Sequence, residues 1–260
     1  MRVRAIQGVF FRYFYALKKG PHQLSDLFYW PLIDILLWGL TSVWVAKSDS
    51  NVELPLVLMT GLIFWQITWR GSVDISVSLL QELWHRNLIN LFASPLRLKE
   101  WCAGVMLLCL GKLVITVFFG LLMVYLLYAL KVYLIGWAFI PFAAMLLCFG
   151  WSLGFIAASL IVRFGHRIEA IAFMVGYVFA PFSAVFYPIS VLPEWAQRIS
   201  WCLPTTYIFE GMRLILQKQA FPLSYFGMSF LLNGIFLSLS IWLFFFSFKK
   251  AKEKGLARLE

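Results

Sequence analysis

The sequence predicts an all-α integral membrane protein with six transmembrane helices, an N-terminal interfacial helix, a cytoplasmic amphipathic helix and an outer re-entrant helical hairpin before the last span. Of its 260 residues, 62% are hydrophobic and only 13% are charged, with a mean hydropathy of +0.84. One soluble core cannot hide that much apolar surface. The spans leave little room for a separate domain, so we expect a single transmembrane domain over residues 1–260.

Residues 1–22 are expected to form an interfacial helix that lies on the membrane before the first span. Arg2, Arg4 and Arg12 interrupt any apolar stretch of the kind that a secretory signal needs, and no small-residue cleavage site follows. Apolar residues instead recur at helical spacing, at Val3, Ile6, Phe10, Tyr13, Phe14 and Leu17. The basic residues fall largely on the other faces, as in helices that bind the membrane surface.

Six apolar runs are each about 20 residues long, which is the length that a helix needs to cross the hydrocarbon core. They cover about 27–46, 54–73, 103–127, 137–161, 168–187 and 225–248.

Region 81–100, between the second and third runs, is too polar to span the membrane and too apolar to be a disordered linker. Leu83, Trp84, Leu88, Leu91 and Phe92 approximate one face of a helix, and the pattern stops at a proline. Such an amphipathic helix either lies on lipid or docks into another protein, and both interpretations stay open.

Segment 188–222, between the fifth and sixth runs, is rich in Trp and punctuated by Pro, and it suits neither water nor a full span. Pro193 is expected at the first position of a short helix, and Pro204 between two short helices. We therefore predict a hairpin that dips into the outer leaflet.

The distribution of Lys and Arg indicates the orientation, because positively charged loops stay in the cytoplasm. With the N-terminus inside, the inner segments hold fifteen Lys and Arg and the outer segments five, while Arg70 and Lys112 lie within spans. Both termini are therefore predicted to be cytoplasmic, in a multi-pass protein of the cell inner membrane. Binding to anionic membrane lipid accounts for the net charge of +10, and no nucleic acid partner is expected.

Charged residues inside membrane spans are costly and often functional. Asp34 lies in the first predicted span, Arg70 and Asp74 near the inner end of the second, and Lys112 early in the third. One interpretation is an Arg70–Asp74 pair within a helix, with Lys112 extending toward the cytoplasm. The other makes Asp34 and Arg70 part of a polar network that lines a pathway.

The chain lacks the motifs of an enzyme. Gly111 and Lys112 are followed by Leu113, and Met106 stands where a phosphate-binding loop needs its first Gly, so the chain does not itself hydrolyse nucleotide. The three histidines lie in separate segments without metal-ligand spacing, so we expect neither a metal site nor catalytic residues.

Four features, in the same order along nearly the whole chain, resemble the membrane subunit (permease) of type-2 ABC exporters. The first three are the N-terminal amphipathic helix, the stretch Asn90-Leu91-Phe92-Ala93-Ser94-Pro95-Leu96-Arg97, which is similar to the coupling helix of the family, and the pair Gly111-Lys112. The fourth is a group of outer motifs, Phe186-Tyr187-Pro188, Leu192-Pro193-Glu194-Trp195, Pro204-Thr205-Thr206-Tyr207 and Gly211-Met212-Arg213. Where the family usually has Asn before the proline of the second outer motif, this chain has Leu203.

The resemblance implies a bacterial, ATP-driven exporter that moves a lipid-like, drug-like or glycolipid substrate outward. This chain would bind no cofactor, because ATP and Mg²⁺ belong to a separate ATPase subunit, and it would pair with a second copy of itself around a central route. A helix over 82–95 would receive the push of the ATPase, and the turn at 165–169 would make a second, smaller contact. The implied coupling residues are Glu82, Arg86, Leu91, Pro95, Arg97, His166 and Arg167.

The resemblance also implies a translocation pathway and an outer gate. Pathway candidates are Asp34, Trp38, Trp65, Arg70, Phe179, Phe182, Phe186 and Tyr187. Gate candidates are Pro188, Pro193, Trp195 and Pro204. The alternative for the aromatic residues is an anchor at the membrane boundary, and the alternative for the hairpin is a passive plug.

Arg12-Tyr13 is followed by Phe14-Tyr15 and not by the pattern typical of the polysaccharide branch, which favours the drug or lipid branches. A polysaccharide or lipid-linked glycan export permease of the same family remains the alternative. From another class, the rival is a membrane scaffold or binding protein that transports nothing. A channel is disfavoured because no filter motif is found.

Overall fold

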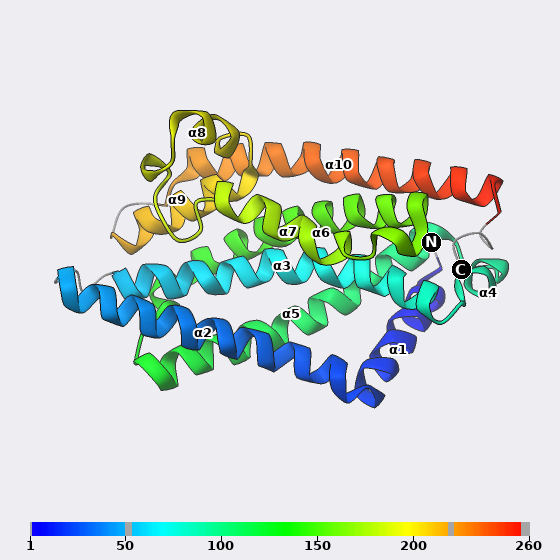
Figure 1. Cartoon of the computed structure of the whole chain (residues 1–260), viewed down its shortest axis with the longest axis horizontal. Coiled ribbons are helices and arrows are strands. Elements are labelled where there is room, and N and C mark those ends of the chain that lie inside the picture. Colours follow the sequence, from blue (N-terminus) through cyan, green and yellow to red (C-terminus); the bar gives the residue numbers. More distant parts are fainter. Residues whose placement is uncertain (1, 50–53, 218–220, 256–260) are drawn as a thin grey trace.

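A computed structural model describes residues 2–49, 54–217 and 221–255 (Figure 1). All regular elements in these ranges are helices. The longer ones are α1 (Val3–Lys19), α2 (Pro21–Asp49), α3 (Leu54–Trp84), α5 (Leu98–Tyr128), α6 (Phe139–Phe164), α9 (Pro204–Leu216) and α10 (Leu223–Glu253). The shorter ones are α4 (Leu88–Ala93), α7 (Ile171–Phe179), α8 (Glu194–Ser200) and the 3₁₀ turns η1 (Val132–Ala138), η2 (Gly165–Ile168), η3 (Ala180–Phe182) and η4 (Ile189–Val191).

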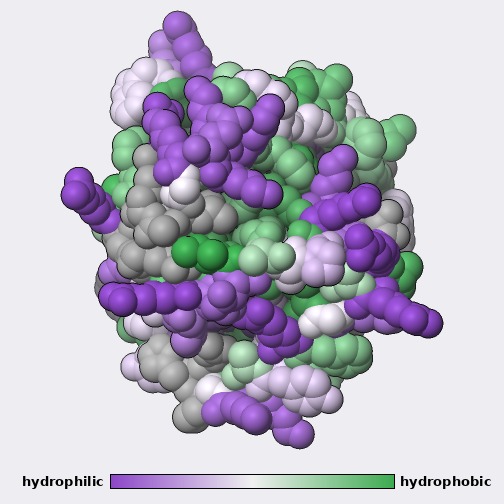
Figure 2. Space-filling view, turned by 90° about the vertical axis from the view of Figure 1, so that its right-hand side faces the viewer, coloured by the Kyte–Doolittle hydropathy of each residue, from purple (hydrophilic) through white to green (hydrophobic). Residues whose placement is uncertain are grey.

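The long helices run along the length of the molecule, and α7 lies beside α3 and α6, whereas α4 and α8 lie at opposite ends (Figure 1). The α1 helix, α4 and the last turns of α10 lie at one end, which we call the α4 end, whereas α8 lies at the opposite end, the α8 end (Figure 1). Viewed from the α4 end, hydrophilic side chains dominate the surface, with hydrophobic ones between them (Figure 2).

Among the described residues, four helical segments are long and apolar enough to cross a membrane, namely Leu24–Lys47, Leu98–Tyr128, Ile135–Phe164 and Leu223–Glu253. They contain the predicted spans 27–46, 103–127, 137–161 and 225–248. Each of these helices is longer than its apolar run, because polar and basic residues extend the helix beyond that run. The all-α, multi-pass character of the chain is therefore confirmed.

The second predicted span, 54–73, is the first part of α3, which continues to Trp84 and is not among those four segments. Most of α3 is buried, and it contacts α2, α5, α6, α7 and α9. Protein rather than lipid surrounds this helix, so it tolerates polar residues such as Gln66, Arg70 and Asp74 that lower its hydropathy.

The fifth predicted span, 168–187, is wrong as a single helix. The α7 helix ends at Phe179, and only the turn η3 follows. Pro181 lacks the N–H that would continue the helical ladder, so only a short 3₁₀ turn follows. The chain then turns through Ala184, which has a left-handed φ of 53°, and residues 183–185 are buried.

Glycines allow the backbones of α3 and α6 to come into direct contact. A Cβ on Gly150 of α6 would lie 2.5 Å from the carbonyl oxygen of Thr68, and one on Gly154 would lie 2.8 Å from that of Ser72. Gly150 and Gly154 are four residues apart, which places them on one helix face, as in the small-xxx-small pattern of membrane helix pairs.

The predicted outer segment 188–222 contains two short helices, α8 and α9, joined at residues 201–203. Pro204 is the first residue of α9, whereas Pro193 is the N-cap of α8, one residue before the predicted position. Leu203 is the N-cap of α9 and makes no side-chain cap. Its side chain is buried in a cluster with Phe149 and Leu153 of α6, so packing replaces a polar cap.

Candidate functional site

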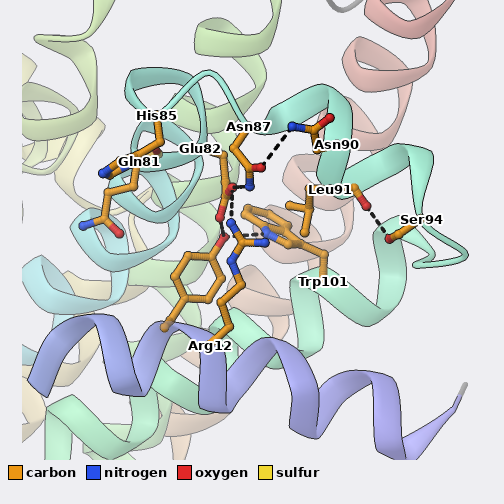
Figure 3. A network of polar contacts seen from close by, with 10 residues as sticks. Arg12, Gln81, Glu82, His85, Asn87, Asn90, Leu91, Ser94 and Trp101 are labelled. Atoms are coloured by element: carbon orange, nitrogen blue, oxygen red, sulfur yellow. Dashed lines mark hydrogen bonds and ion pairs between the residues drawn. The ribbon is translucent and has the colours of Figure 1, made fainter. Parts of the chain in front are cut away.

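A buried carboxylate at the last turn of α3 joins elements that are far apart in the sequence. Glu82 is 3% exposed and accepts hydrogen bonds from Arg12 and Tyr13 of α1 (Nη2 to Oε2 and Oη to Oε1, both 2.7 Å) (Figure 3). It also accepts one from Asn87 (Nδ2 to Oε2, 2.8 Å). Trp101 of α5 extends the network by donating from Nε1 to the Tyr13 hydroxyl at 3.0 Å. We call these five residues the Glu82 joint.

The joint helps to dock one face of α1 against the rest of the protein. Val9, Tyr13 and Leu17 recur every four residues and are buried. At the contact with α5, a Cβ on Gly104 would lie 2.6 Å from Val9 Cγ1. The α1 helix is therefore docked on one face, while residues such as Tyr15 stay exposed on another.

The phenol of Tyr13 is held in its neutral form. Burial raises the pKa of Tyr13 well above its ordinary value, and the nearby Glu82 carboxylate raises that pKa further. The neutral hydroxyl can donate to Glu82 and accept from Trp101 at the same time. Both hydrogen bonds of this side chain are therefore formed at physiological pH.

The predicted helix over 82–95 is wrong: the chain turns between α3 and α4. Arg86 takes a left-handed φ of 49° there, and the Asn87 N–H donates to the carbonyl of Glu82 at 2.8 Å. Apolar residues recur at helix-like spacing across this turn because the end of α3 and the α4 helix both pack against one core. Leu88 and Leu91 of α4 are buried in the same cluster as Trp101.

This turn determines which of the predicted coupling residues are exposed and can contact another protein. Glu82 and Leu91 are buried within the chain, so neither presents a surface to another protein. Arg86, Pro95 and Arg97 are exposed. The exposed face between the ends of α3 and α5 is formed by these three together with His85, Asn90, Ala93 and Ser94.

The second predicted contact, at 165–169, is tied to the first. Trp84 Nε1 donates to Glu169 Oε2 at 3.0 Å, which links the end of α3 to the residue after η2. Arg167 is exposed, whereas the side chain of His166 lies outside the described residues.

The α5 helix begins at a second carboxylate anchor that the sequence reasoning missed. Glu100 is buried and accepts hydrogen bonds from the backbone N–H groups of Arg2 (2.9 Å) and Arg97 (3.1 Å). A glutamate three residues after the cap position is the signal that marks such a helix start. The beginning of α1 is thereby fixed to the beginning of α5.

The intramembrane charges form one cluster on α3 and α5. Asp74 Oδ1 lies 3.0 Å from Lys112 Nζ and 3.9 Å from Arg70 Nη1. Arg70 also donates to the carbonyl oxygen of Asp26 at 3.1 Å. The predicted Arg70–Asp74 pair within one helix is therefore formed, and Lys112 of α5 joins it through Asp74.

Asp34 stands apart from that cluster, on α2. It is half-buried, and no ion pair joins it to Arg70 among the described residues. The network of Asp34 with Arg70 is therefore not formed; Arg70 instead donates to the backbone carbonyl of Asp26, eight residues before Asp34 on α2.

The aromatic pathway candidates divide into core residues and exposed ones. Trp65 is 6% exposed and belongs to a core cluster, and Phe179 contacts Phe149 at 6.0 Å between ring centroids. Trp38 of α2 is exposed and stacks on Phe186 at 4.3 Å, which joins α2 to the segment after η3.

The remaining aromatic and gate candidates lie at the α8 end. Phe182 contacts Trp195, and the Tyr187 hydroxyl donates to the carbonyl of Pro181. Pro188 is the N-cap of η4. The structure thus brings Phe182 and Trp195 together.

Two residues of α9 hold this end together: Arg213, which belongs to the motif Gly211-Met212-Arg213, and Glu210, which the sequence reasoning missed. Arg213 donates to the carbonyl oxygens of Ala184 and Tyr187, and Glu210 accepts from the Ile189 N–H at 2.7 Å. These contacts satisfy the backbone of the non-helical segment that follows η3. Glu210 and Arg213, three residues apart in a largely apolar helix, are the signal that could have found this pair.

Comparison with known proteins adds one match. The family model of the ABC-2 type transporter matches residues 23–216, which is most of the chain. Among curated proteins, no similar sequence was found.

Proposed function

Because the chain belongs to the ABC-2 type transporter family, and is a multi-pass membrane component of such a transporter, we propose that it is the permease of an ATP-driven exporter. A separate ATPase subunit would bind ATP and Mg²⁺ and supply the energy. Two copies of this chain would form the route, and the substrate would be lipid-like, drug-like or a glycolipid. The α4 end, with most of the Lys and Arg, would face the cytoplasm, and the α8 end would face outward.

The observation that carries this proposal is the Glu82 joint. A force on the exposed face around α4 would reach α3 through Glu82, α1 through Arg12 and Tyr13, and α5 through Trp101. Coupling needs a mechanical connection between a docking surface and the helices that line the route. A scaffold protein that transports nothing would not need a hydrogen-bonded connection of this kind at the end of α3.

Six crossings of the membrane remain our proposal. The α7 helix with η3 covers twelve residues, about 18 Å at 1.5 Å per residue, against a hydrocarbon core of about 30 Å. The segment 183–187 would complete the crossing. Non-helical backbone is tolerated at that depth only when protein buries it, and the buried Ser183, Ala184 and Val185, with Arg213 on two carbonyls, meet this condition.

The coupling proposal is tested on the exposed face of α4. We expect Ala93→Glu and Pro95→Glu to leave the chain folded in the membrane but to weaken binding of the ATPase at least about tenfold, the equivalent of about 1.4 kcal/mol. The control is Gln7→Glu, which adds the same charge to an exposed position of α1. Binding is measured by co-purification, and coupling by the ATPase rate with and without the permease.

Two results would count against this assignment. If both α4 variants bind and stimulate the ATPase as wild type does, the docking surface lies elsewhere. If no nucleotide-hydrolysing subunit co-purifies with the wild-type chain, the scaffold function is favoured instead.

A further inference from the structure

A basic pocket lies between the ends of α6 and α10. Its volume is about 150 Å³, and it is lined by Arg163, Leu243, Phe246, Ser247, Lys250, Ala251 and Lys254. Since one water occupies about 30 Å³, the pocket has room for a phosphate group. It lies at the α4 end, where hydrophilic side chains dominate the surface (Figure 2).

The cations of this pocket form no ion pair with a carboxylate in the described part of the chain, although Arg163 lies over the Phe164 ring at 5.5 Å. Arg163, Lys250 and Lys254 supply three cations and the lining contains no carboxylate. The ion pairs of the described residues involve Arg12, Arg70 and Lys112 instead. Lys250 Nζ lies 4.4 Å from the centroid of the Phe246 ring, which leaves its hydrogen-bond donors available. Three cations around one cavity repel one another unless an anion lies between them.

An exposed apolar stripe leads into the pocket along α10. Leu239, Trp242 and Phe246 are spaced by three and four residues, so they share one face, and they are 60%, 63% and 44% exposed. Trp242 and Phe246 stack at 5.5 Å. This helix is one of the four that are long and apolar enough to cross a membrane, so the stripe faces lipid. A soluble phosphate would gain nothing from such a stripe, whereas an acyl chain would cover it.

We propose that this pocket binds the phosphate headgroup of an anionic phospholipid, with an acyl chain along Leu239, Trp242 and Phe246. Arg163 and the two lysines would share the phosphate oxygens, and the Ser247 hydroxyl would donate a further hydrogen bond. Basic pockets between membrane helices on the cytoplasmic side are suited to such headgroups. The site depends only on insertion of the chain in a membrane and not on the transport function proposed above.

The test compares two double variants with the same change of charge on the same helix. Lys250→Gln with Lys254→Gln removes two pocket cations, and Lys249→Gln with Lys252→Gln removes two exposed cations outside it. Native mass spectrometry measures binding of phosphatidylglycerol and of phosphatidylcholine with identical acyl chains. The pocket variant should bind phosphatidylglycerol about 30-fold more weakly, at about 1 kcal/mol per lysine, and the control should change less than about 3-fold. Glycerol phosphate, which has no acyl chain, should not compete.

Equal losses in the two double variants would mean diffuse attraction to the membrane surface and would overturn the site. Competition by glycerol phosphate at the same concentration as lipid would assign the pocket to a soluble phosphate and also overturn it. If the pocket variant fails to fold, a second test uses Ser247→Cys in a background with Cys202→Ala. This variant keeps every charge of the pocket. Its labelling by a maleimide in nanodiscs should be slower with phosphatidylglycerol than with phosphatidylcholine, and equal rates would refute the proposal.

Discussion

Glu82 is a buried carboxylate that connects several helices of the protein. Its two oxygens take hydrogen bonds from α1 and from the turn before α4, and Tyr13 passes the connection to Trp101. A buried carboxylate is stable only when its acceptor sites are filled. The joint is therefore an all-or-none contact, since removing one donor leaves its neighbours unsatisfied.

Tyr13→Phe deletes the hydroxyl at the centre of this joint. We expect a loss of about 1–3 kcal/mol of stability, because Trp101 Nε1 and one Glu82 oxygen would lose their partner in a buried place. Tyr15→Phe is the matched control: it deletes the same hydroxyl from an exposed position of α1 and should cost less than about 0.5 kcal/mol. Unfolding in detergent micelles measures both, and equal effects would contradict the importance of the joint.

The charge cluster on α3 and α5 makes a second prediction for single residues. Asp74→Asn leaves Lys112 and Arg70 without their carboxylate and should destabilise the chain by about 3 kcal/mol. Adding Lys112→Gln removes one of the uncompensated charges and should recover part of that loss. A double-mutant cycle measures the coupling. Strictly additive losses would show that the two residues do not interact.

The helices themselves are held by close backbone contact as well as by side chains. At the crossing of α3 and α6, Gly150 has no space for a Cβ, because the carbonyl of Thr68 would lie 2.5 Å away. Gly234, on an exposed face of α10, has nothing within 4 Å of the same position. The two glycines therefore differ in their surroundings and not in their helical conformation.

Gly150→Ala and Gly234→Ala are expected to have effects of opposite sign. The first must separate α3 from α6 and should cost about 1–3 kcal/mol, the usual range for overpacking. The second replaces an exposed helical glycine and should be neutral or stabilising by up to about 1 kcal/mol. Thermal unfolding of the two variants measures the difference. A stabilising Gly150→Ala would show that the helices do not approach as closely as described.

The whole molecule has two distinct ends, with α4 and the last turns of α10 at one and α8 at the other (Figure 1). The basic residues gather at the α4 end, and Arg213 and Glu210 stabilise the α8 end. Such polarity along the long axis predicts that the two ends lie on opposite sides of the membrane.

Cysteine labelling tests this orientation. In a background with Cys202→Ser, which removes the one exposed native cysteine of the described residues, Arg198→Cys on α8 should react with an impermeant maleimide added outside intact cells. Lys252→Cys at the end of α10 should react only after the cells are opened. The reverse pattern would invert the topology, and labelling of both from outside would contradict a membrane crossing by α10.

Hydropathy and local pattern determined the membrane character, the helical class, the positions of four spans and the N-terminal helix, because each depends on residues close in the sequence. They could not determine where α3 ends, since its continuation to Trp84 and the turn at Arg86 depend on Glu82 meeting Arg12, Tyr13 and Asn87. Apolar spacing across residues 83–92 therefore predicted one helix where there are two.

Only the tertiary structure decided which charged and aromatic residues meet. It paired Lys112 with Asp74, placed Trp65 in the core and left Trp38 on the surface against Phe186. The outer hairpin was visible as two proline-marked helices, but the burial of Leu203 was not. The physical reason is the same throughout: hydropathy is a property of a segment, whereas a hydrogen bond or a packed ring needs a partner that the fold brings from elsewhere in the chain.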